Sequence, residues 1–318
     1  MAKTLDVLAS NVGSARGTEL LVVDNGPAGD TQAILLRAES RLGIPVRYLQ
    51  ESRPGLHHAR HAGAAAARGE VLIFIDDDVN VSENWLSAHL EAYRNSEISA
   101  AGGPVVARWE STPPDWIEVV PDDYFSLLDY GDQSRPIQGA EGINGCNYSI
   151  LRESLFGAGG FHPDSFPDPS MIWLRGDGEA GLTRELLSRH ERVMYLADAK
   201  VFHRISDERL SITSLSKRAF AHGIENGYTF ARKRHCRAWS LVALYLIGLA
   251  AALAIAPAFG FRSRSPENIA RSELARARYR ALRSYATRLA RNRDLRMHVM
   301  MNTYLEEFAT EANKVRTY

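Results

Sequence analysis

The first hundred residues alternate between patterns typical of buried strands and patterns typical of helices, and this alternation constrains the fold most. Apolar runs that suit buried strands occur at 19–24, 45–50 and 70–76. Segments with helical spacing lie at 30–43, 57–69 and 82–95. Strands that alternate with helices at this spacing predict βαβ units and a mostly parallel sheet. Ligands of such sheets bind at the carboxyl ends of the strands, where Asp24 and Asp76 stand.

Three adjacent carboxylates, Asp76, Asp77 and Asp78, close the third strand-like run. Adjacent negative charges repel one another, so they are stable only when they are solvated or neutralised by a cation. Oxygen ligands favour Mg²⁺ or Mn²⁺, and magnesium typically binds through one or two carboxylates together with substrate phosphates. Two interpretations therefore stay open here: a site for a metal-bound diphosphate at Asp76 and Asp78, or a solvated acidic turn.

Length, net charge and cysteine content limit the size of the domain, the kind of partner and the compartment. The chain has 318 residues and 45% hydrophobic content, which is enough for one large domain or for a domain with an appendage. The formal net charge is zero, so nothing global indicates a nucleic-acid partner. The two cysteines, Cys146 and Cys236, lie far apart and belong to no zinc-ligand pattern, which favours a reducing, cytoplasmic compartment.

Five segments, taken in order, resemble the family 2 glycosyltransferases. The residues "LLVVDNGPAGDT" are similar to the family's "VVDNGSTDGT", and "ARHAGAAAARGEVLIFIDDDV" is similar to its "ARN-x-G" segment followed by the D-x-D motif. The five similar segments are 20–31, 51–79, 142–161, 175–186 and 201–203. The resemblance covers roughly residues 4–205 and implies the GT-A fold, an α/β nucleotide-diphospho-sugar transferase fold with flanking helices.

The resemblance also implies roles for individual residues. The family's strand-end acid contacts the nucleotide, and its D-x-D motif holds a divalent metal, Mn²⁺ or Mg²⁺. The implied nucleotide-sugar contacts are Asp24, Asn25, Arg53, Gly55, Arg60, Asp76, Asp77 and Asn147. The implied metal contacts are Asp76, Asp78 and His203.

The family transfers sugars with inversion, and the acceptor hydroxyl needs a general base because a hydroxyl is a weak nucleophile. The segment "RGDGEAGLTREL" resembles the family's acidic motif at a helix start, so Glu179 or Asp177 is the implied base. The positive end of the helix would keep such an acid ionised. In this sequence the two acids stand two positions apart rather than adjacent. The spacing to Leu182 favours Glu179, and Asp177 could be only a helix-start acid.

One element of the family pattern is missing from this sequence. Family members usually have a central strand before the helix that holds "TLDSL", and this sequence starts at "MAKTLDVLAS". We therefore expect the edges of the neighbouring strands to be exposed and half of the nucleotide cradle to be lost.

The chain is predicted to contain a GT-A domain and a helical extension. The expected domain covers 1–205, with a nucleotide-binding part at 1–98 and an acceptor and donor-sugar part at 99–205. The extension, 206–318, contains an uncharged apolar run at 239–261 that is long enough to span a bilayer. Basic residues flank this run on both sides, whereas a single span usually shows an imbalance. This symmetry favours contact of 217–264 with the inner face of the cell membrane over a span, and a buried helix is the alternative.

Together these features predict a metal-dependent, inverting glycosyltransferase of surface polysaccharide or glycolipid synthesis. The expected donor is a UDP-, GDP- or dTDP-sugar, and the expected acceptor is a saccharide or a lipid-linked saccharide. A nucleotidyltransferase of similar fold is one alternative, but it would usually carry a glycine-rich, basic loop after its first strand. A noncatalytic protein at the membrane is the other alternative, because the usual first strand is missing.

Overall fold

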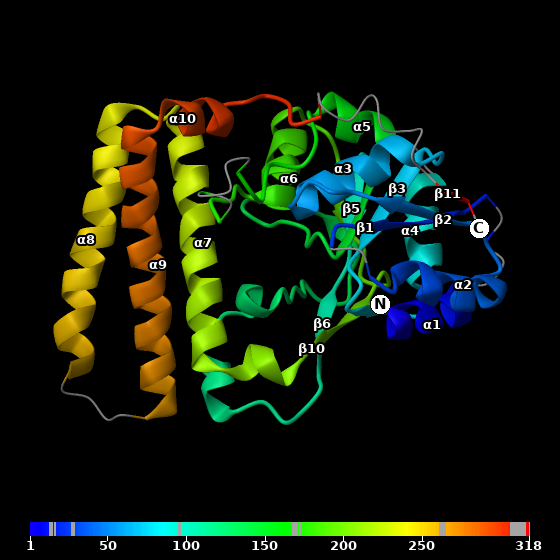
Figure 1. Cartoon of the computed structure of the whole chain (residues 1–318), viewed down its shortest axis with the longest axis horizontal. Coiled ribbons are helices and arrows are strands. Elements are labelled where there is room, and N and C mark those ends of the chain that lie inside the picture. Colours follow the sequence, from blue (N-terminus) through cyan, green and yellow to red (C-terminus); the bar gives the residue numbers. More distant parts are fainter. Residues whose placement is uncertain are drawn as a thin grey trace.

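The computed structural model combines an α/β part with a layer of long helices on one side (Figure 1). It describes residues 1–12, 15, 17–26, 29–94, 97–166, 171, 173–260, 265–305 and 316–317.

The first sheet is small and is covered by two helices. Strands β1 (Leu20–Asp24) and β2 (Val46–Gln50) pair in parallel, and the short β11 (Arg316–Thr317) adds antiparallel to β2. Helix α1 (Ala2–Asn11) packs against α2 (Thr31–Leu42), which connects the two parallel strands. Helix α2 ends at Gly43, whose φ of 65° lies in the left-handed region that glycine adopts without steric cost. The predicted β–α–β unit is therefore present.

The second sheet is the central one, and it is mixed rather than mostly parallel as expected. Its order is β3, β8, β5, β9, β7. These strands are β3 (Val71–Ile75), β5 (Ala100–Gly102), β7 (Arg135–Pro136), β8 (Asn147–Leu151) and β9 (Val193–Tyr195). Strand β8 runs antiparallel between β3 and β5, because the chain reaches it through an irregular segment rather than a crossover helix.

The third sheet joins the acidic segment to a distant strand. Strand β4 (Val79–Val81) starts directly after the three aspartates and pairs antiparallel with β10 (Val201–Ile205), which in turn pairs in parallel with β6 (Val105–Trp109). The register sets His203 opposite Val79. The segment of three aspartates after β3 therefore leads directly to the middle of β10.

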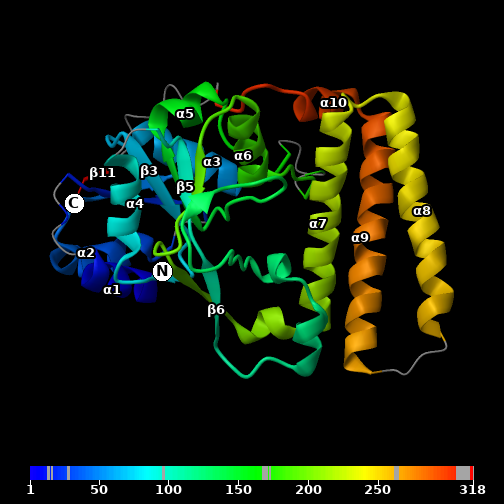
Figure 2. The ribbon, with the colours of Figure 1, turned by 180° about the vertical axis from the view of Figure 1, so that it is seen from behind.

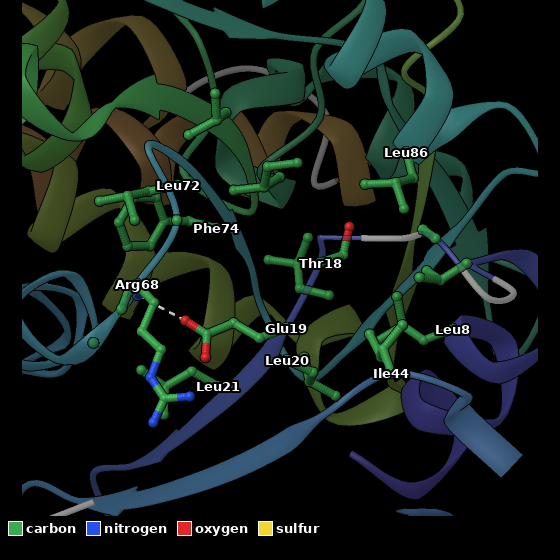
Figure 3. A pocket seen from close by; sticks show the side chains of 18 of the residues that line it. Leu8, Thr18, Glu19, Leu20, Leu21, Ile44, Arg68, Leu72, Phe74 and Leu86 are labelled. Carbon is green, nitrogen blue, oxygen red and sulfur yellow. Dashed lines mark hydrogen bonds between the residues drawn. The ribbon is translucent and has the colours of Figure 1, made fainter.

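A cavity of about 1120 Å³ separates the first sheet from the central sheet (Figure 3). Leu21 and Val23 of β1 line it, as do Val71 and Ile73 of β3. Among the described strands, β1 pairs only with β2 and β3 pairs only with β8. The N–H of Leu20 donates to the backbone oxygen of Pro45, on the side of β2. Backbone groups of successive residues in a strand point in opposite directions, so those of Leu21 and Val23 point toward the cavity. Among the described strands, the two edges that border the cavity are thus unpaired.

The remaining helices pack around and beside the sheets. Short helices are α3 (Leu56–Ala66), α4 (Trp85–Arg94), α5 (Arg152–Gly157), α6 (Gly178–Ser188) and α10 (Arg293–Val299), with 3-10 turns η1 (Asp115–Val119), η2 (Asp122–Phe125) and η4 (Asp207–Leu210). The long helices are α7 (Ile212–Lys233), α8 (Ala238–Gly260) and α9 (Pro266–Arg291). Helix α9 packs between α7 and α8, and α7 faces the sheets (Figures 1 and 2). The domain boundary at 205 stays a prediction.

Candidate active site

The three aspartates after β3 point in different directions. Asp76 faces Arg60 of α3, and Asp78 faces His203 of β10. The side chain of Asp77 is 75% exposed, and its backbone oxygen accepts a hydrogen bond from Thr4. Asp76 and Asp78 therefore belong to two neighbouring contact groups, whereas the carboxylate of Asp77 lies outside both.

Arg60 connects the end of β3 to the start of α6. Its Nη1 lies 3.2 Å from Oε2 of Glu179, and its Nη2 lies 3.5 Å from Oδ1 of Asp76. The side chain is 8% exposed and packs on Gly145, where a Cβ would lie only 2.5 Å from the guanidinium. The backbone N–H of Gly145 donates to Oε1 of Glu179 at 3.0 Å. One buried cation thus holds a D-x-D acid and the favoured base candidate together.

Negative charge exceeds positive charge at this point. Burial raises the pKa of Asp76; Arg60 opposes that shift, and the charges of Asp78 and Glu179 add to it. Burial also opposes the charge on Arg60, but Glu179 and Asp76 raise its pKa overall. Two carboxylates, Asp76 and Glu179, share one buried arginine, so a further cation beside them would be stabilised by the excess negative charge.

Asp78 and His203 form a pair that fits a divalent metal. Nδ1 of His203 lies 2.8 Å from the backbone oxygen of Phe125, which assigns the proton to Nδ1 and leaves Nε2 as an acceptor. That Nε2 lies 3.2 Å from Oδ2 of Asp78 and accepts from Arg209 at 2.9 Å. The buried Oδ1 of Asp78 has no hydrogen-bond partner among the described residues. The orphaned carboxylate oxygen is a suitable donor for Mn²⁺ or Mg²⁺. Nε2 of His203 could join it as a ligand once Arg209 moved away from that nitrogen.

The complete set of predicted metal contacts does not come together. Within the described part of the chain, no group of three His, Cys, Asp or Glu side chains is placed to hold a metal ion. The carboxylate of Asp76 contacts Arg60 instead of joining Asp78 and His203. Magnesium commonly completes its coordination with waters and substrate phosphates, so it needs only one or two ligands from the protein.

The two candidate bases have different surroundings. Asp177 is 6% exposed, and its carboxylate accepts hydrogen bonds of 2.6 Å from both His162 and Thr229 and pairs with Arg184. Burial opposes its ionisation, but these partners hold the pKa of Asp177 below its usual value. Glu179 is 29% exposed and lies in the first turn of α6. Glu179 can therefore meet a substrate, whereas Asp177 is fully engaged by its neighbours.

Predicted nucleotide contacts gather beyond the carboxyl ends of β1 and β2. Oδ1 of Asp24 accepts from the N–H of Gly26 at 3.0 Å. Asn25 donates to the backbone oxygen of Arg53 at 2.6 Å and accepts from the N–H of Gly55 at 3.1 Å. Arg53 pairs with Glu51 at 2.8 Å. Asn25 thus fixes the loop that leads into α3.

Gly55 precedes α3 in a backbone conformation that favours glycine, with a φ of 128°. A Cβ there would lie 2.5 Å from Oγ of Ser165. Asp164 accepts from the N–H groups of Leu56 at 2.7 Å and His57 at 3.1 Å, and it also pairs with the His57 ring. No local sequence pattern predicts this helix cap, because Asp164 lies more than 100 residues from α3 in the chain.

Asn147 lies inside the protein rather than at the surface of the site. Its side chain is fully buried, accepts from the indole N–H of Trp85 at 2.9 Å and donates to the backbone oxygen of Ala199 at 2.6 Å. It therefore connects β8 to α4 and to the segment before β10. Arg209, the neighbour of His203, was also missed, because η4 offers no motif that indicates it.

The fold and the site define an α/β enzyme whose acidic groups lie at the carboxyl ends of strands. Residues 1–159, half of the chain, match the family described as Glycosyl transferase family 2. The chain belongs to this family and is a glycosyltransferase. The predicted GT-A fold class, with a helical C-terminal part, is confirmed.

Similar proteins include two curated relatives. The chain is 27% identical over 255 residues to the "Succinoglycan biosynthesis protein ExoM" of Rhizobium meliloti, covering 76% of this chain and 75% of that protein. It is 25% identical over 187 residues to the "Glucosyl-dolichyl phosphate glucuronosyltransferase" of Haloferax volcanii, covering 56% of each. The chain thus spans about half the length of this second relative.

Solved structures with some similarity include "GalNAc-T7 with UDP, GalNAc and Mn2+", at a TM-score of 0.43 and 16% identity over 69% of this chain and 45% of that one. They also include S. aureus TarS, at a TM-score of 0.45 and 15% identity over 69% of this chain and 36% of that one.

Proposed function

We propose that this chain transfers a sugar from a nucleotide-diphosphate donor to an acceptor hydroxyl with inversion at the anomeric carbon. The observation that carries the proposal is the Arg60 bridge, which holds Glu179 and Asp76 on either side of one buried guanidinium. Direct displacement needs a base for the acceptor hydroxyl and a cation for the departing diphosphate. Arg60 holds the base candidate Glu179 beside the D-x-D segment, which would supply the ligands of that cation.

In this proposal Glu179 accepts the proton of the acceptor hydroxyl as that oxygen attacks the anomeric carbon. The N–H of Gly145 and the guanidinium of Arg60 orient the Glu179 carboxylate before the proton is transferred. Asp78 and His203 would hold Mn²⁺ or Mg²⁺, which when bound neutralises the charge that develops on the departing diphosphate. Asp177 has no chemical step and instead anchors the start of α6 to α7 through Thr229.

The donor's nucleotide would lie beyond the carboxyl ends of β1 and β2. Asp24 and the loop fixed by Asn25 would border the base and ribose, with Arg53 and Gly55 beside them. The proposed donor is a UDP-, GDP- or dTDP-sugar.

The acceptor is proposed to be a saccharide or a lipid-linked saccharide in surface polysaccharide or glycolipid synthesis. The names of the two relatives, a succinoglycan biosynthesis protein and a dolichyl phosphate glucuronosyltransferase, support this class of acceptor. We place the reaction in the cytoplasm, because Cys146 and Cys236 are both free thiols in the structure.

Calorimetry with UDP, GDP and dTDP, with and without Mn²⁺, tests the donor site. We expect one nucleotide to bind in a metal-dependent manner, and Asp78→Ala to weaken that binding about tenfold or more, since it removes the orphaned carboxylate oxygen. Asp6→Ala is the matched control, because this surface aspartate of α1 is 53% exposed and pairs with an exposed arginine. Equal binding by both variants would contradict the assignment.

A noncatalytic role is the second candidate, and the cavity between β1 and β3 is the observation that favours it. This cavity borders the strand ends that would contact the nucleotide. A folded sample that binds none of the three nucleotides, with or without Mn²⁺, would favour this second candidate over the enzyme.

A further inference from the structure

Helix α8 exposes a row of large apolar side chains. The exposed fractions are 57% for Trp239, 58% for Val242, 37% for Tyr245, 52% for Leu246 and 46% for Ile247. Single exposed apolar residues are ordinary on protein surfaces, but a contiguous patch of this kind marks an interaction site. We call these five residues the α8 face.

The α8 face is uncovered because of how the helices are layered. Leu241 and Leu244, on the opposite side of the helix, are buried in the core that α7 and α9 share. Helix α8 packs extensively on α9 and little on α7, so it forms the outer edge of the helical layer. Both views show α8 at the end of the molecule furthest from the sheets, with no described element beyond it (Figures 1 and 2).

Charge is distributed very unevenly along the chain. Residues 232–291, from the end of α7 through α9, carry 13 arginines and lysines and only two glutamates. The whole chain has 38 basic and 38 acidic residues, so the remainder carries 25 basic and 36 acidic ones. A neutral protein thus concentrates its positive charge in the segments of the chain that precede and follow α8, including α9.

Arginines border the α8 face directly. The guanidinium of Arg283 on α9 lies 5.4 Å from the ring centroid of Tyr245. Its side chain packs against Gly248, where a Cβ would lie 2.7 Å from Cγ of Arg283. Arg237 is exposed just before α8 begins. Apolar groups that can enter the acyl boundary therefore lie beside cations that can pair with phosphate headgroups.

We propose that the α8 face docks on an anionic lipid surface, with the helix lying in the plane of the interface. Apolar burial together with attraction to anionic headgroups is the usual basis of such binding. A second copy of the chain is a poorer occupant, because two surfaces with this excess of arginine would repel each other. Among the described residues, no helix is both long enough and apolar enough to cross a membrane.

Vesicle co-sedimentation of the full chain tests this proposal. We expect binding to vesicles that contain phosphatidylglycerol, weaker binding to pure phosphatidylcholine, and a decrease with added salt, because exposed charges are screened. The double variant Val242→Glu and Leu246→Glu should lose about tenfold or more in binding, since two carboxylates would enter the apolar interface. Leu36→Glu is the matched control, because this residue of α2 is also exposed, at 56%, but lies far from α8.

Three outcomes would overturn the proposal. One is absence of binding to anionic vesicles by the intact chain, and another is equal binding by the double variant and the Leu36→Glu control. The third is a dimer in sedimentation velocity that the double variant converts to a monomer, because the α8 face would then bind a second copy. None of these readouts depends on sugar transfer, so they are independent of the proposed activity.

Discussion

Exchanging Asp177 and Glu179 for their amides should separate a residue that holds the fold from one that performs the chemistry. In Asp177→Asn, one of the two carboxylate oxygens becomes an amide nitrogen, which cannot accept the hydrogen bond from His162 or Thr229. Hydrogen bonds to charged groups contribute about 1.5–3 kcal/mol each. Arg184 is 40% exposed, so solvent screens its share. We therefore expect the free energy of unfolding to fall by about 3 kcal/mol.

Glu179→Gln should behave in the opposite way. Its side chain is partly exposed and accepts from Gly145 and Arg60, and a glutamine oxygen can keep one of these bonds, so the loss of stability is about 1 kcal/mol. Loss of the general base should lower the rate of sugar transfer by about 10²- to 10⁴-fold. Urea denaturation followed by circular dichroism, and transfer assays on the same samples, measure both quantities.

The pH dependence of stability gives an independent check on Asp177. Its pKa in the folded protein is below its usual value, so the carboxylate stabilises the fold at neutral pH. That contribution is lost as the pH falls below about 4 and through the folded-state pKa. The stability gap between the intact chain and Asp177→Asn should therefore close under acid. If Asp177→Asn keeps its stability and loses turnover while Glu179→Gln keeps turnover, the two roles are reversed.

Three further predictions concern residues that position the site. Arg60→Met should lower the free energy of unfolding by about 3 kcal/mol, because Asp76 and Glu179 lose their buried cation. Urea denaturation measures this loss, and an unchanged midpoint would contradict it. Asp164→Ala should cost about 1–2 kcal/mol by the same measurement, since it removes the cap of α3. The amides of Val23 and Ile73 face the cavity and should exchange hydrogen about tenfold or more faster than that of Leu72, as followed by NMR; equal protection would argue against open strand edges.

Local patterns predicted the elements near the site. The apolar runs and the helical spacing predicted β1, β3 and α2 to within a few residues, because strand and helix periods are properties of neighbouring residues. The same patterns predicted that Asp24 and Asp76 lie at the ends of strands. The mixed direction of the central sheet was not predicted. The antiparallel pairing of β8 with β3 joins segments far apart in the chain, and local periodicity carries no information on such pairing.

The order of residues along the chain is enough to place acids at strand ends and helix starts, and so to name the candidates for the chemistry. The different surroundings of these candidates depend on contacts between distant segments. Arg60 meets Glu179 across 119 residues, and Asp177 is enclosed by His162 and by Thr229 of α7. These contacts depend on how sheets and helices pack together. Because the residues lie far apart in the chain, no local sequence pattern predicts that they meet.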